Sequence, residues 1–169
     1  MECEKRKEIK METIYDVPVL LRREIEALMV KPFLDAFEKE LGHEKTYEIV
    51  EKVIAEIAFE QGKDYAVVLG GNGIDALMGQ AESWSANDAL DVDMKVENET
   101  DCYMTVKRCA YVDMYDRIGM KDLGATLSCL RDEYFYEGMN PEIKMSRSKT
   151  LMSGGDCCDF CLRFPKQKD

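Results

Sequence analysis

The chain has 169 residues, 46% of them hydrophobic and 34% charged, a composition typical of one globular domain. Its formal net charge of -11 disfavours phosphate backbones and anionic lipid, so we expect neither nucleic acid nor membrane as a partner. No apolar run approaches the roughly 20 residues of a membrane span and no secretory signal is visible, so a cytoplasmic protein is expected.

Two amphipathic helices are predicted near the start. Apolar residues recur at spacings of three and four from residue 19 to residue 41, and Gly42 ends this segment. Pro32 lies inside it and predicts a kink or a break. A second helix is expected over 44–61, stopped by Gly62 and paired antiparallel with the first. The apolar stripe of the first helix consists of Leu21, Ile25, Leu28, Met29, Phe33, Ala36, Phe37 and Leu41.

The periodicity changes from helix to strand near Trp84. Before it, residues 64–81 fit a helix better than a strand. After it, apolar and polar residues alternate over 92–97 and again over 102–107, which is typical of half-buried strands. The four residues between them, Asn98 to Asp101, predict a hairpin turn.

The last third combines helices with a closing hairpin. Helical patterns cover 110–118 and 122–136. A Gly-Gly-Asp turn at 154–156 then separates two extended runs, 143–151 and 157–164.

Helices followed by hairpins indicate an α+β fold. In it, N-terminal helices pack on an antiparallel sheet built from hairpins with intervening helices. We expect one domain over 19–165, an N-terminal extension over 1–18 and a tail over 166–169.

The cysteines and the histidine restrict the chemistry. Seven cysteines, an odd number, favour free thiols, ligands or nucleophiles over a disulfide framework. The single histidine, His43, argues against Ser-His-Asp hydrolysis and histidine-rich metal sites. Thiols, carboxylates and arginines must then supply the chemistry, and we expect no cofactor.

Candidate site residues lie on the closing hairpin and on the helix before it. Cys158 shares the apolar face of its strand, while Asp159 points to the other face. On the helix, Asp132 and Glu133 follow Cys129 by three and four residues, so two carboxylates lie beside a thiol and can accept its proton or position a water. The alternative is that Cys129 is simply a small, half-buried hydrophobic residue.

Two groups near these thiols carry further hypotheses. Arg131 and Arg108 are placed to offset the negative charge of the helix carboxylates. Cys109, Cys129 and Cys158, from three separate elements, also leave open a mixed-ligand metal site.

Several motifs together resemble the L-2-amino-thiazoline-4-carboxylate hydrolase family. The resemblance extends from about Leu20 to Phe164, and Trp84 with the following Asp88-Ala89-Leu90 also fits the family pattern. The motifs that carry it are Val106-Lys107-Arg108-Cys109-Ala110-Tyr111, Leu127-Ser128-Cys129-Leu130-Arg131-Asp132, Asn140-Pro141 and Gly154 to Phe160.

The resemblance implies hydrolysis of a 2-aminothiazoline ring to N-carbamoyl-L-cysteine, a small-molecule substrate. For catalysis it implies Cys129 or Cys158 as nucleophile or thiol acid, Asp132 as general base and Asp159 as orienting group. For binding it implies Arg108 or Arg131 as the partner of the substrate carboxylate, with Cys109 and Trp84 as further substrate contacts. A non-catalytic small-molecule-binding domain and a cysteine-ligated metal-binding domain remain as alternatives. The sequence leaves open whether the chain forms a homo-oligomer.

Overall fold

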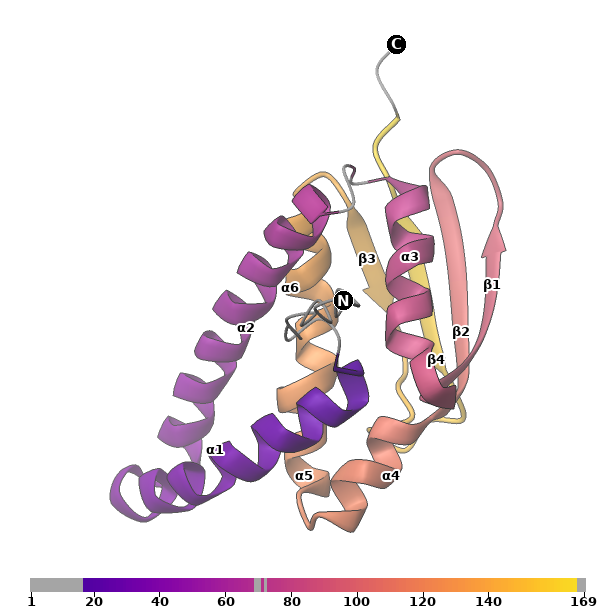
Figure 1. Ribbon diagram of the computed structural model, residues 1–169. Coiled ribbons are helices and arrows are strands. Elements are labelled where there is room, and N and C mark those ends of the chain that lie inside the picture. Colours follow the sequence, from indigo (N-terminus) through magenta and orange to yellow (C-terminus); the bar gives the residue numbers. More distant parts are fainter. Residues whose placement is uncertain (1–16, 69–70, 72, 167–169) are drawn as a thin grey trace, which may run out of the picture.

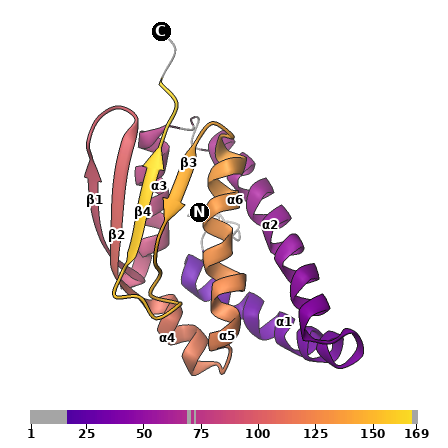
Figure 2. The same cartoon turned by 180° about the vertical axis from the view of Figure 1, so that it is seen from behind.

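A computed structural model describes residues 17–68, 71 and 73–166 of the chain. It contains helices and one four-stranded antiparallel sheet, which confirms the predicted α+β class (Figures 1 and 2). The expected extension over 1–18 and tail over 166–169 fall almost wholly outside the described residues. In order, the elements are α1 (Val19–Leu41), α2 (His43–Val68), α3 (Ile74–Ser85), the short helix η2 (Ala86–Asp88), β1 (Leu90–Val96), β2 (Asp101–Cys109), α4 (Ala110–Arg117), α5 (Lys121–Gly124), η3 (Ala125–Cys129), α6 (Leu130–Met139), β3 (Lys144–Arg147) and β4 (Cys158–Arg163).

The sheet is built from the two predicted hairpins. Its strand order is β1-β2-β4-β3, and every neighbouring pair is antiparallel. Asn98 closes the first hairpin, because its Oδ1 accepts hydrogen bonds from the backbone N–H groups of Thr100 at 2.8 Å and Asp101 at 2.9 Å. In the second hairpin β3 is shorter than the extended run expected over 143–151, and residues 148–157 form a long connection to β4.

One face of β4 is buried, as the alternation predicted. Cys158, Phe160 and Leu162 are at most 6% exposed, whereas Asp159 and Cys161 lie on the opposite, more accessible face. The buried face of the sheet is turned towards the helices (Figure 1), so a residue on this face is directed into the interior.

Two glycines bring α2 and α6 into backbone contact. A Cβ atom added at Gly62 would lie 2.1 Å from the carbonyl oxygen of Phe135, and one added at Gly138 would lie 2.0 Å from the carbonyl oxygen of Phe59. The prediction that Gly62 ends the second helix is therefore wrong: the helix continues to Val68, and the glycine serves the helix crossing. The expected antiparallel pairing of the first two helices is also wrong, since α2 packs mainly on α6 while α1 diverges from the Gly42 junction (Figure 1).

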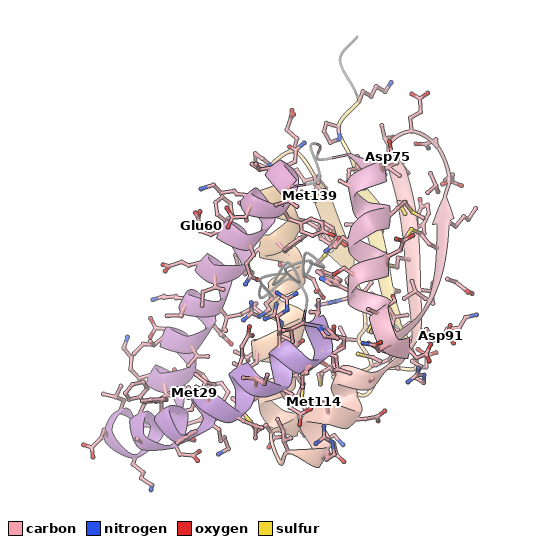
Figure 3. The ribbon with its side chains drawn as sticks, viewed as in Figure 1. Met29, Glu60, Asp75, Asp91, Met114 and Met139 are labelled. Atoms are coloured by element: carbon pink, nitrogen blue, oxygen red, sulfur yellow. The ribbon has the colours of Figure 1, made fainter. Side chains whose placement is uncertain are left out.

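Helix α1 runs unbroken through Pro32, so the predicted break does not occur. Its buried side is formed by Val19, Arg23, Ala27 and Leu34. The large members of the predicted apolar stripe face outward instead, and Met29, labelled in Figure 3, is 68% exposed. The pattern identified the helix correctly, but it did not show which side of the helix is buried.

The helical segment before β3 changes its hydrogen bonding along its length. Residues 121–139 are helical throughout, but Ala125–Cys129 form a π-helix between α5 and α6. Such π segments reorient side chains and are frequent at functional sites. Helix is found for most of the segment 64–81, at the end of α2 and in α3, although Gly71 and Gly73 between them are not helical. Among the described residues no helix has the length and apolarity needed to cross a membrane.

Candidate functional site

A partly open cavity of about 510 Å³ lies between the helices and the buried face of the sheet. This volume suits a small organic molecule. Much of its wall is apolar, including Trp84, Met104, Val106, Phe135 and Phe160. Its charged and thiol-bearing lining residues are Arg22, Arg23, Asp64, Cys109, Cys129, Arg131, Asp132, Arg147 and Cys158.

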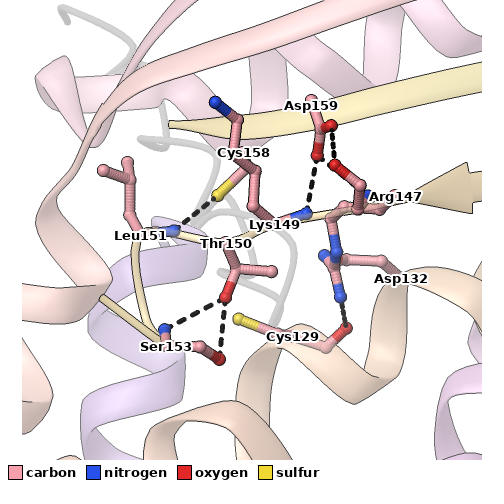
Figure 4. A network of polar contacts seen from close by, with 10 residues as sticks. Cys129, Asp132, Arg147, Lys149, Thr150, Leu151, Ser153, Cys158 and Asp159 are labelled. Carbon is pink, nitrogen blue, oxygen red and sulfur yellow. Dashed lines mark hydrogen bonds and ion pairs between the residues drawn. The ribbon is translucent and has the colours of Figure 1, made fainter. Parts of the chain in front are cut away.

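Three cysteines from separate elements reach this cavity. Cys109 lies at the junction of β2 and α4, Cys129 ends the π-helix and Cys158 begins β4. The Sγ of Cys158 accepts a hydrogen bond from the backbone N–H of Leu151 at 3.2 Å, as Figure 4 shows. The fold thus brings together side chains that are up to 49 positions apart in the chain.

The thiols of this cavity are protonated at neutral pH. Burial raises the pKa of Cys109 to about 11, although backbone N–H groups at the start of α4 favour its thiolate. Burial and then Asp132 raise the pKa of Cys129 to about 12. Burial also raises the pKa of Cys158, opposed by the Leu151 N–H and by Arg147. At pH 7 a thiol of pKa 12 is ionised in only about one molecule in 10⁵.

A buried ion pair forms what we call the acid end of the cavity, Asp132 and Arg147. The Nη1 of Arg147 lies 2.6 Å from Asp132 Oδ2, and both side chains are less than one fifth exposed. Arg147 also donates to the carbonyl oxygen of Cys129 at 3.2 Å (Figure 4). Its guanidinium lies over the ring of Phe160, 5.0 Å from the ring centroid. These contacts fix the guanidinium, which in turn fixes the carboxylate.

Burial sets the protonation of this carboxylate. It raises the pKa of Asp132 to about 6, against the opposing effect of Arg147. A carboxylate with a pKa just below neutrality is mostly ionised at pH 7 and still able to take up a proton. These are the properties of a general base.

Three arginines form what we call the arginine end: Arg22, Arg23 and Arg131. Arg131 Nε donates to the carbonyl oxygen of Leu127 at 2.9 Å and its Nη1 to Gln61 Oε1 at 3.2 Å. Burial, followed by repulsion from Arg23, lowers the pKa of Arg131 to about 10, so it remains charged at pH 7.

Few acceptors balance these guanidinium groups. Arg23 and Arg131 share one carboxylate, Glu26, and the buried Nε of Arg22 has no acceptor among the residues that the structure describes. Positive charge and a spare donor suit an anionic group of a ligand.

Two predicted site residues lie outside the cavity. Asp159 accepts hydrogen bonds from the backbone N–H groups of Ser148 at 3.0 Å and Lys149 at 2.8 Å, and these and the Ser148 hydroxyl lower its pKa to about 2. It holds the β3–β4 connection in place (Figure 4). Arg108 is exposed and donates to the carbonyl oxygen of Asp88. The other predicted residues, Trp84, Cys109, Cys129, Arg131, Asp132 and Cys158, line the cavity.

Sequence reasoning missed Arg147, Arg22 and Arg23. A signal existed for Arg147, because it shares a strand face with Met145 and an arginine on an inward face needs a buried partner. No comparable signal marked Arg22 and Arg23, which lie on a helix side that the apolar stripe had suggested was exposed.

The mixed-ligand metal hypothesis finds no support in the geometry. Within the described ranges, no three histidine, cysteine, aspartate or glutamate side chains are arranged to hold a metal ion. The cavity thiols line a common space without forming a chelating set.

The fold and cavity define an α+β protein with a cavity that is sized for a small molecule and lined by thiols, arginines and two carboxylates, Asp64 and Asp132. The chain belongs to the L-2-amino-thiazoline-4-carboxylic acid hydrolase family, whose model matches residues 22–162. No curated protein matches the chain.

Two solved structures are similar to part of this fold. One is the phenol-responsive sensory domain of the transcription activator PoxR with phenol, at 8% identity and a TM-score of 0.47, covering 86% of this chain and 75% of that one. The other is trafficking protein particle complex subunit 3 from Naegleria fowleri covalently bound to palmitic acid, at 12% identity and a TM-score of 0.47, covering 86% and 96%.

Proposed function

We propose that this protein hydrolyses a small cyclic amidine carrying a carboxylate, of the 2-amino-thiazoline-4-carboxylate type. The observation that carries the proposal is the buried Asp132–Arg147 pair on the wall of a cavity that also holds three arginines. A ligand with a carboxylate at one side and a basic amidine at the other matches these two ends in charge. Family membership supports the choice of this substrate class.

The two ends of the cavity divide the work between binding and chemistry. Arg131 contacts Glu26 on α1 and Gln61 on α2. Asp132 instead pairs with Arg147 on β3. The arginine end holds the substrate carboxylate, and the aromatic and aliphatic walls exclude water from the ring. The acid end then faces the amidine carbon.

Asp132 activates a water molecule in the proposed reaction. As the water oxygen bonds to the amidine carbon, Asp132 accepts a proton and the electron pair of the C=N bond moves to the ring nitrogen. Collapse of the tetrahedral carbon breaks the C–S bond. The two water protons end on the ring nitrogen and on the sulfur, giving N-carbamoyl-cysteine with a free thiol.

We favour water over a cysteine as nucleophile because the cavity thiols are protonated. Cys158 is the best of the three thiols as an alternative nucleophile, since the Leu151 N–H and Arg147 both favour its thiolate. Cys129, with a pKa of about 12, is the poorest.

The test is turnover of L-2-amino-thiazoline-4-carboxylate, with product followed by chromatography. Asp132→Asn should abolish turnover, while the matched variant Glu133→Gln, which removes an exposed carboxylate one residue away, should keep it. Unchanged turnover in Asp132→Asn would refute the assignment of the base.

A non-catalytic binding protein is the second candidate, favoured by the largely apolar cavity wall. It predicts that the same compound raises the melting temperature without being consumed. Stabilisation without product in the wild-type chain would favour this candidate over hydrolysis.

A further inference from the structure

The outer side of α1 carries a row of large apolar side chains. They stand at every fourth position along the helix and are all close to half exposed or more: Leu21 48%, Ile25 55%, Met29 68%, Phe33 53%, Phe37 48% and Leu41 50%. In the part of the chain that the structure describes, no element covers this row. Six consecutive members without a polar interruption form one continuous ridge of the i±4 type.

The ridge is symmetric about its own midpoint. With residue 31 as the centre, Leu21 is matched by Leu41, Ile25 by Phe37 and Met29 by Phe33. A helix that meets a second copy of itself in antiparallel orientation, about a two-fold axis next to residue 31, brings Met29 of one copy opposite Phe33 of the other, with the outer pairs farther apart. Such an isologous contact is the commonest form of protein self-association.

We infer that α1 forms a two-fold antiparallel interface with α1 of a second copy of this chain. When i±4 ridges of two helices interdigitate, the helices cross at about -50°, so the middle of each ridge makes the closest contact. Met29 and Phe33 therefore lie at the centre of the interface. Met29 of each copy lies opposite Phe33 of the other copy. Met29 is also the most exposed residue of the ridge.

The available area fits a dimer. If a fully exposed large apolar side chain offers on the order of 170 Å², the ridge and its neighbour Leu28, at 52% exposure, present roughly 600 Å². This is at the upper end of the roughly 300–600 Å² found for the largest patch on a monomer. Two copies together offer at most the roughly 1,200 Å² at which standard interfaces begin, as expected for a dimer that dissociates on dilution.

Charge does not oppose the contact. Although the chain as a whole has a net charge of -11, α1 holds four basic and five acidic side chains and is nearly neutral. The net negative charge of the chain therefore lies mainly outside α1, and two α1 helices can approach each other without strong repulsion.

The first test is the molecular mass of the full-length chain in solution by light scattering. The wild type should be a dimer that dissociates on dilution. Met29→Glu and Phe33→Lys should each weaken the dimer on the order of 100-fold or more, because each places two like charges in an apolar contact. The control Val67→Glu, at an 81% exposed position on α2, should leave the mass unchanged.

The second test addresses the two-fold arrangement itself. Mixing the Met29→Glu and Phe33→Lys chains should restore a dimer, since a heterodimer pairs the glutamate with the lysine and keeps one native Met29–Phe33 contact. Circular dichroism melting of each variant checks that it is folded. A monomeric wild type overturns the inference, as does a dimer that survives both variants; failure of the mixture to dimerise overturns the antiparallel arrangement.

Discussion

The pH dependence of hydrolysis distinguishes an Asp132-activated water from a thiolate. If ionised Asp132 is the base, kcat/KM should rise to half its maximum near pH 6, where burial places the pKa of Asp132, and stay flat above about pH 7. With this pKa the ionised fraction is about 91% at pH 7 and about 9% at pH 5, so the rate should fall roughly tenfold from pH 7 to pH 5.

Removing Arg147 shows whether this midpoint belongs to Asp132. The guanidinium, 2.6 Å from the carboxylate, favours the ionised form, so Arg147→Met should move the midpoint upward by roughly one to three pH units. Titration of the substrate would not respond to this change. Chromatographic measurement of the carbamoyl product is preferable to a thiol reagent, because the protein itself contains seven cysteines. A rate that keeps rising above pH 8 in the wild type would indicate a thiolate and refute the role given to Asp132.

Three further outcomes are expected. Cys158→Ser should keep turnover within about tenfold of wild type, since a serine preserves the space without a thiol; a complete loss with folding intact would restore the cysteine as nucleophile. Asp132 has a pKa of about 6 in the folded protein, against 3.8 for an ordinary aspartate. This difference gives up to about 3 kcal/mol of unfolding free energy that is present below about pH 4 and lost as the pH rises through 6. The unfolding free energy of Asp132→Asn, measured in urea at several pH values, should lack this dependence. Gly62→Ala should lower the unfolding free energy by roughly 1–3 kcal/mol, because the added methyl group meets the backbone of α6. The control Gly71→Ala, with no atom within 4 Å of its added methyl group, should change it by less than about 0.5 kcal/mol. Equal effects of the two substitutions would contradict the close helix contact.

Strand periodicity gave reliable predictions because it depends on local geometry. The alternation around Cys158 and Phe160 predicted their burial, and Asn98 marked a turn that the structure contains. Strand faces have only two choices, and the polar residues exclude one of them.

The helices were harder to interpret from sequence. The stripe along α1 identified a helix, but its apolar residues face outward, and the buried side is built from smaller residues and Arg23. Gly62 was interpreted as a stop because a glycine at a helix crossing has the same local signature as a glycine at a helix end. Only the position of α6 distinguishes the two.

The candidate site was predicted in its parts more than in its arrangement. The thiols and Asp132 stand in recognisable motifs, whereas the partner of Asp132 is 15 residues away on a different element. Ion pairs between distant segments produce no characteristic spacing in the sequence. Arg147 could therefore be identified as the partner of Asp132 only from the three-dimensional structure.

The crossing of α2 and α6 has a consequence for how this scaffold can change over evolution. Main-chain atoms at Gly62 and Gly138 make the closest contact, so this part of the crossing depends on the two glycines. Cavity positions on the sheet side, such as Cys109 and Cys158, can then be exchanged without loosening the joint, whereas Gln61 and Arg131 are hydrogen-bonded across it. Relatives with the same two glycines should therefore tolerate diverse chamber linings, so that new ligands can be acquired at little structural cost.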